Sequence, residues 1–128
     1  HQRDFINWKN FQIYPIQVQE GGIPIIIGGS KGKIFERIAR LGYGWFATTN
    51  DAAGLAPMLE PLKAACSDAG RDYDSVEITS MWDNQGGLDA IKAFSDLGVS
   101  RILVPMFALG KDPLAGISKL AEEIVAKV

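Results

Sequence analysis

The sequence contains one cysteine and one histidine, and this scarcity excludes several kinds of site. With Cys66 alone no intrachain disulfide can form, which suits a reducing cytoplasm, and we expect a cytoplasmic protein. The only histidine is the first residue, His1, so neither a His-based catalytic triad nor a zinc site is expected. Cys66 lies in an apolar helical pattern, which predicts a packed thiol rather than a nucleophile.

Other signals are missing as well. The chain has neither the Gly-x-Gly-x-x-Gly dinucleotide fingerprint nor a P-loop. No signal-peptide pattern opens it, and no apolar run approaches the ~20 residues that a membrane-spanning helix needs. The net charge of −2 gives no reason to expect nucleic acid or an anionic membrane as a partner. The 128 residues suffice for one domain and one core. We therefore expect a single domain over 1–128, with an irregular lead-in over 1–22.

The sequence does contain four successive pairs of a strand-like run and a helix-like run. The expected strands cover 23–27, 44–48, 76–80 and 101–104. Apolar residues at helical spacing follow each strand, and short strands alternating with amphipathic helices predict an α/β fold with a parallel sheet. The continuous apolar first strand suits both a (β/α)8-type barrel and an open doubly wound sheet.

Local signals predict where the helices begin and end. Asn50 or Asp51 is a candidate N-cap of the second helix, but Pro57 and Pro61 predict that this helix begins near Pro57 or kinks. Asp112 followed by Pro113 is typical of an N-cap and first helical residue. The apolar residues of the last helix predict a buried face; they are Leu114, Ile117, Leu120, Ala121, Ile124, Val125 and Val128.

Characteristic residues surround the expected strands: Gly28-Gly29-Ser30 after the first, Ala69-Gly70-Arg71-Asp72 before the third and Leu97-Gly98-Val99-Ser100-Arg101-Ile102 before the fourth. The three segments that contain them resemble the bacterial luciferase-like family, which comprises flavin-dependent monooxygenases and oxidoreductases that depend on the deazaflavin coenzyme F-420. The first segment, 21–46, holds the turn Gly28-Gly29-Ser30 between a strand and a helix. The second, 69–72, precedes the third strand, and the third, 97–102, precedes the fourth. Where such proteins usually show an Asp before a Gly-Trp pair, this chain has Tyr43. The resemblance implies a (β/α)8 barrel, of which this chain corresponds to the C-terminal half.

The resemblance also implies a cofactor, FMN or coenzyme F-420, whose phosphate contacts Gly28, Gly29 and Ser30. A glycine turn before a helix N-terminus suits an anion, although a tight turn without a ligand is the ordinary alternative. Lys31 would add positive charge. Trp45 would lie near the cofactor ring, or else fill the barrel interior or the helix layer. We assign no catalytic and no metal-binding residue, and the isolated chain is expected to lack a complete active site.

Half a barrel leaves two free sheet edges and an apolar inner face, which favour association. We therefore expect a homodimer, or pairing with a complementary N-terminal half-barrel. Two functions stay open at this point. One is the C-terminal half-barrel of a luciferase-like oxidoreductase that contributes the cofactor phosphate site. The other is a non-catalytic, self-associating binding or assembly module.

Overall fold

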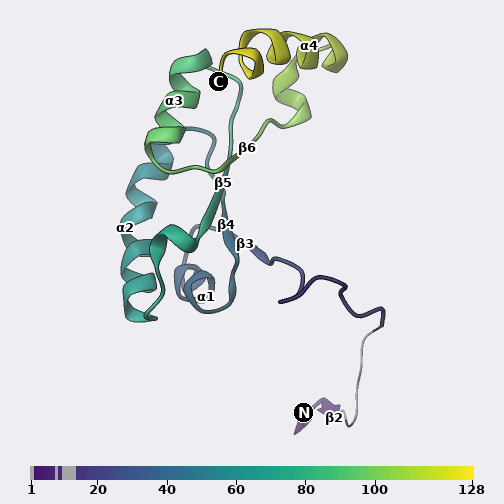
Figure 1. Ribbon diagram of the computed structural model, residues 1–128, viewed down its shortest axis with the longest axis vertical. Coiled ribbons are helices and arrows are strands. Elements are labelled where there is room, and N and C mark those ends of the chain that lie inside the picture. The colour runs from purple at the N-terminus through teal and green to yellow at the C-terminus, as the bar shows by residue number, and fades with distance from the viewer. Residues whose placement is uncertain (1, 8, 10–13) are drawn as a thin grey trace.

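The computed structural model describes residues 2–7, 9 and 14–128, and four parallel strands form its main sheet (Figure 1). The strand order follows the sequence. The strands are β3 (Ile26–Gly28), β4 (Gly44–Ala47), β5 (Glu77–Met81) and β6 (Arg101–Leu103). They alternate with the helices α1 (Ile34–Leu41), α2 (Ala52–Asp68), α3 (Gly87–Asp96) and α4 (Pro113–Glu123), and with the short helices η1 (Tyr73–Ser75), η2 (Met106–Leu109) and η3 (Val125–Lys127). The predicted α/β class with four strand-helix units is confirmed.

The lead-in contains a little regular structure. Two short strands, β1 (Gln2–Arg3) and β2 (Ile6–Asn7), pair in antiparallel fashion. Residues 14–22 form neither helix nor strand. Residues 1, 8 and 10–13 of the predicted lead-in lie outside the described part of the chain.

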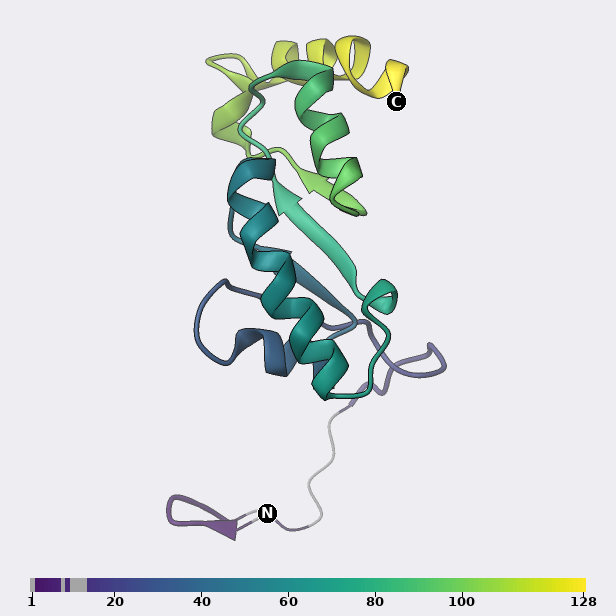
Figure 2. The ribbon, with the colours of Figure 1, turned by 90° about the vertical axis from the view of Figure 1, so that its left-hand side faces the viewer.

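Helices α1, α2 and α3 all cover one face of the sheet, as the two views show (Figures 1 and 2). Side chains alternate along a strand, so one residue in two points at the helices. In register these are Trp45 on β4 and Ile78 on β5, both fully or almost fully buried. A doubly wound sheet would carry helices on both faces and reverse its strand order. The sequential order and one-sided cover instead correspond to half of a (β/α)8 barrel.

The opposite, inner face of the sheet carries a mixture of apolar and charged side chains. At its two edge strands Ile26 and Leu103 are 37% and 44% exposed. Between them, Arg101 Nη1 lies 2.5 Å from Glu77 Oε1 and forms an ion pair. Thr79 is buried, and its hydroxyl has no hydrogen-bond partner among the described residues. This face would line the interior of a closed barrel.

Helix α2 begins earlier than the prolines suggest. Asp51 is its N-cap, and Asp51 Oδ1 accepts a hydrogen bond of 2.6 Å from the amide of Gly54. The prediction that the helix begins near Pro57 is wrong, because both Pro57 and Pro61 lie inside the continuous helix. The buried residues Leu55, Leu59, Leu62 and Cys66 pack against the sheet and compensate for the two missing amide donors.

Helix α4 departs from the predicted packing. Asp112 caps it as expected, accepting hydrogen bonds from the amides of Leu114 and Ala115. The prediction of a buried apolar face is wrong: Leu114 is 78% exposed and Ile117 53% exposed. Of the predicted stripe only Ile124 is buried. The helix lies across the carboxyl end of the sheet instead of running back beside β6 (Figures 1 and 2). In a barrel such a helix packs over two strands, and among the described residues β6 pairs with β5 alone.

Candidate functional site

The carboxyl ends of the four strands meet at one rim of the sheet, where barrel enzymes place their active sites. The turn between β3 and α1 is the part of this rim richest in glycine. Gly28 ends the strand, and its missing side chain leaves a Cβ position 3.7 Å from the Phe46 ring. Gly29 has a φ of +126°, which L side chains rarely adopt, so this position requires glycine. The turn therefore presents bare backbone to the rim.

A pair of hydroxyl groups joins this turn to the next strand. Ser30 Oγ and Thr48 Oγ1 are hydrogen bonded to each other. The strand register explains the contact: Gly28 pairs with Phe46, so two residues further on Ser30 lies opposite Thr48. The sequence motifs alone do not single out Thr48. Because both residues follow the ends of adjacent parallel strands, extending the register would have identified it.

The buried side chain of Trp45 stabilises the turn. Its side chain is fully buried in the helix layer, where its ring meets that of Phe35 edge-on with centroids 5.4 Å apart. Its indole Nε1 donates a hydrogen bond of 2.7 Å to the carbonyl oxygen of Gly29. Of the roles considered for Trp45, this position matches the filling of the helix layer. The tryptophan therefore fixes the turn and has no exposed surface to offer to a cofactor ring.

The turn leads into a helix N-terminus that no side chain caps. Lys33 is the N-cap of α1 and makes no side-chain capping hydrogen bond. In contrast, Asp51 and Asp112 cap α2 and α4. Among the described residues, the backbone amides of Ser30, Lys31 and Gly32 donate to no other protein group. Lys31 and Lys33 are exposed at the same place. Unpaired amides, two hydroxyl groups and two lysines together form a suitable site for an anion.

The other rim residues have structural partners. Asp83 accepts a hydrogen bond from the amide of Gln85, which is an ordinary turn contact. Asn84 donates from Nδ2 to the carbonyl of Ala108 at 3.3 Å. Met106 and Phe107, after β6, are 71% and 81% exposed. The rim therefore has an uncovered apolar surface beside β6 and the glycine turn beside β3, at opposite ends.

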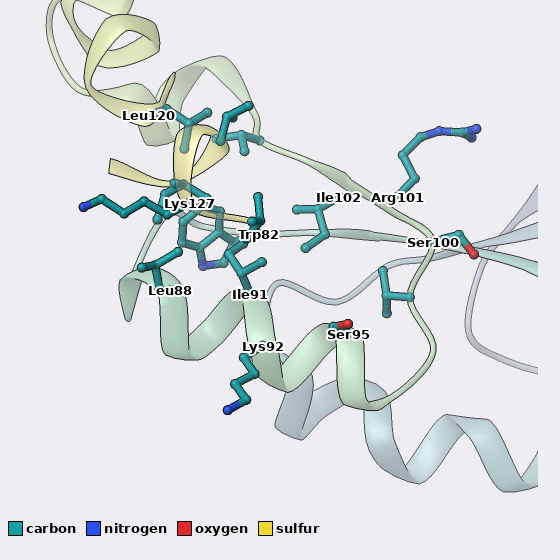
Figure 3. A pocket seen from close by; sticks show the side chains of 15 residues that line it. Trp82, Leu88, Ile91, Lys92, Ser95, Ser100, Arg101, Ile102, Leu120 and Lys127 are labelled. Carbon is teal, nitrogen blue, oxygen red and sulfur yellow. The ribbon is translucent and has the colours of Figure 1, made fainter. Parts of the chain in front are cut away.

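A separate groove of ≈ 720 Å³ lies on the outer side of β6, between α3 and the end of the chain (Figure 3). Its apolar lining includes Leu88, Ile91, Ile102 and Leu120, while Lys92 extends away from this cluster. None of the predicted cofactor residues lines it. The groove exists because α4 is not packed down beside the edge strand.

Two titratable groups are shifted by burial, and neither belongs to the rim. Burial raises the pKa of the Cys66 thiol, in agreement with the predicted packed cysteine. Burial also raises the pKa of the Tyr73 phenol. Within the described part of the chain, no three His, Cys, Asp or Glu side chains cluster in a way that would hold a metal ion. No helix in that part is long and apolar enough to cross a bilayer.

Comparison with known families identifies a match. The model of the luciferase-like monooxygenase family matches residues 1–82, well over half of the chain. The matched region contains the glycine turn, the hydroxyl pair, Trp45 and the 69–72 segment, but not the 97–102 segment. No curated protein matches the chain.

Proposed function

The chain belongs to the luciferase-like monooxygenase family, and from this premise we propose that it is the C-terminal half-barrel of a flavin- or deazaflavin-dependent oxidoreductase. Family members typically use flavin-type cofactors. In this proposal the turn after β3 binds the phosphate end of FMN or coenzyme F-420. When bound, the cofactor would supply the redox chemistry, while the protein supplies binding and orientation.

The geometry of the glycine turn is the observation that supports the proposal. Gly28 and Gly29 allow a phosphate to approach the backbone, and the amides after them are unpaired. Ser30 and Thr48 would each provide a hydroxyl donor once their mutual hydrogen bond is exchanged for the phosphate oxygens. Lys31 would add charge from the solvent side. A hydrogen bond to a charged group contributes about 1.5–3 kcal/mol.

The test compares FMN with riboflavin, which has the same ring system without the phosphate. We expect fluorescence titration to show tighter binding of FMN, and deazaflavin titrated in the same way decides between the two cofactors. Ser30→Ala should weaken FMN binding about 10- to 100-fold, because one donor to the charged phosphate is lost. Ser67→Ala, at an exposed serine on α2, is the matched control and should leave binding unchanged.

Two results would contradict the proposal. One is that folded protein binds neither FMN nor the deazaflavin. The other is that FMN and riboflavin bind equally well, which would leave the phosphate without a role.

A second candidate function is a non-catalytic assembly module that keeps the fold without the chemistry. The exposed apolar residues of the inner face and of α4 favour it, because they suit association rather than catalysis. Self-association without binding of either cofactor, in protein of native helical content, would support this candidate over the first.

A further inference from the structure

The main sheet ends in two unpaired edges that match one another. On β3, the Ile25 carbonyl accepts from Tyr43 and the Gly29 amide donates to Phe46, so these alternate residues face β4. The amide and carbonyl groups of Ile26 and Gly28 therefore face the free edge. On β6, the Leu103 carbonyl accepts from the Trp82 amide, so the alternate residues Arg101 and Leu103 face β5 and the backbone of Ile102 between them faces the other free edge.

The inner face between these edges is also uncovered. Apolar side chains stand at both edges, Ile26 on β3 and Leu103 on β6. The Glu77–Arg101 ion pair and the unpartnered Thr79 hydroxyl lie between them on β5 and β6. Buried polar groups are normally hydrogen bonded, and in the described part of the chain the Thr79 hydroxyl is an exception. This face therefore has the composition of a barrel interior whose opposite side is not yet covered by other strands.

The exposed area of the chain is larger than a compact monomer would have. The chain exposes 9383 Å². A compact protein of 13.9 kDa exposes about 6,700 Å². The chain thus exposes about 2,700 Å² more than a compact monomer would. This excess area is more than three times the roughly 800 Å² that one partner contributes to a standard interface. The extended segment before β3 accounts for part of it (Figure 1). The remainder is compatible with an interface that involves two edges and an inner face.

We propose that a second copy of this chain closes the barrel, with β6 of each copy pairing in parallel with β3 of the other. Rotation by 180° about the barrel axis keeps all strands parallel. Two four-stranded sheets give the eight strands of a (β/α)8 barrel, so the assembly closes after two copies. The closed rim would carry two Gly28-Gly29-Ser30 turns. The proposal is independent of cofactor binding.

A charge exchange at the seam tests this arrangement. Ile26 and Leu103 lie on the same face at opposite edges, so closure brings Ile26 of one copy beside Leu103 of the other. A lysine variant carries Ile26→Lys and Leu103→Lys, and a glutamate variant carries Ile26→Glu and Leu103→Glu. Both positions are partly exposed, so single chains should tolerate the charges. Circular dichroism confirms folding before each measurement. Ala56→Lys, on the exposed side of α2, is the control for added charge.

Sedimentation at micromolar concentration should give the wild type and Ala56→Lys a mass of twice 13.9 kDa. Each seam variant alone should sediment as a monomer, because like charges meet at both seams. Their mixture should recover the dimer, and native mass spectrometry should find one chain of each kind in it. The proposal is overturned by a folded monomeric wild type, by seam variants that dimerise alone, or by a folded mixture that stays monomeric. Association only with a different half-barrel polypeptide would likewise overturn it.

Discussion

The indole N–H of Trp45 is hydrogen bonded to the carbonyl oxygen of Gly29 at 2.7 Å. This bond joins the deepest part of the core to the turn at the rim. Trp45 is fully buried against the Phe35 ring, so its position is determined by packing. The indole therefore fixes the Gly29 carbonyl. The Gly29 amide is fixed as well, because it donates a hydrogen bond to the carbonyl oxygen of Phe46 on β4. The conformation of the glycine turn thus depends on a residue that has no contact with solvent.

Replacing Trp45 tests this dependence. Trp45→Phe removes the donor and leaves the Gly29 carbonyl without its partner, which should lower the free energy of unfolding by about 1–3 kcal/mol. FMN binding should weaken as well, because the turn loses its support. Urea denaturation and fluorescence titration measure the two effects.

Trp82→Phe is the matched control for this variant. Trp82 is also almost fully buried, and its indole donates to the Gln85 carbonyl at 2.7 Å, away from the turn. It should lose a similar amount of stability and retain FMN binding. If both variants lost FMN binding equally, the special role of Trp45 would be excluded.

Replacing Arg71, in the 69–72 segment, by lysine should destabilise the protein. Its guanidinium donates to the carbonyls of Ile38, Gly42 and Tyr43, and also to Ser75. A lysine keeps the charge but cannot reach these acceptors in the same fork geometry. Arg71→Lys should therefore lower the free energy of unfolding by about 1–3 kcal/mol in urea denaturation. Arg40→Lys, at an exposed position on α1, should cost little, and equal losses at both sites would argue against a stabilising role of the Arg71 hydrogen bonds.

Removing the two aspartate N-caps should have different effects, one on the stability of the whole protein and the other on a single helix. Asp51→Ala and Asp112→Ala each remove a cap that contributes about 1 kcal/mol. Helix α2 packs into the core, so Asp51→Ala should lower the global free energy of unfolding. Helix α4 is mostly exposed, so Asp112→Ala should raise hydrogen exchange in α4 alone. Uniform loss of protection across the sheet in Asp112→Ala would show that α4 unfolds together with the core.

Alkaline pH should destabilise the fold. Burial raises the pKa values of Cys66 and Tyr73 above their ordinary 9.0 and 10.0, because the anionic forms are disfavoured. The unfolded chain therefore releases these protons at lower pH than the folded chain. The stabilising difference is fully present below pH 9.0 and is lost as the pH rises through the raised pKa values. Urea denaturation at a series of pH values should show this fall. In Cys66→Ala the free energy of unfolding should fall less steeply with rising pH. An unchanged slope would show that Cys66 does not contribute to the pH dependence.

The sequence determined the local elements. Its apolar periodicity and its glycines located four strands and four helices, and Asp51 and Asp112 cap their helices as the pattern indicates. These features depend on neighbours within a few residues, which a sequence displays directly. The glycine turn could be found in the same way, because Gly29 needs a backbone conformation that only glycine readily adopts.

Only the tertiary structure decided how these elements face one another. Strand register determines whether Trp45 points to the helices or to the inner face, and which hydroxyl lies beside Ser30. The neighbours of the edge strands determine whether the apolar face of α4 is buried. The α4 stripe has the pattern of a buried face, yet burial requires a second surface, and no strand in the described part of the chain lies on the far side of β6. Periodicity fixes which face of a helix is apolar, whereas the fold determines what covers that face.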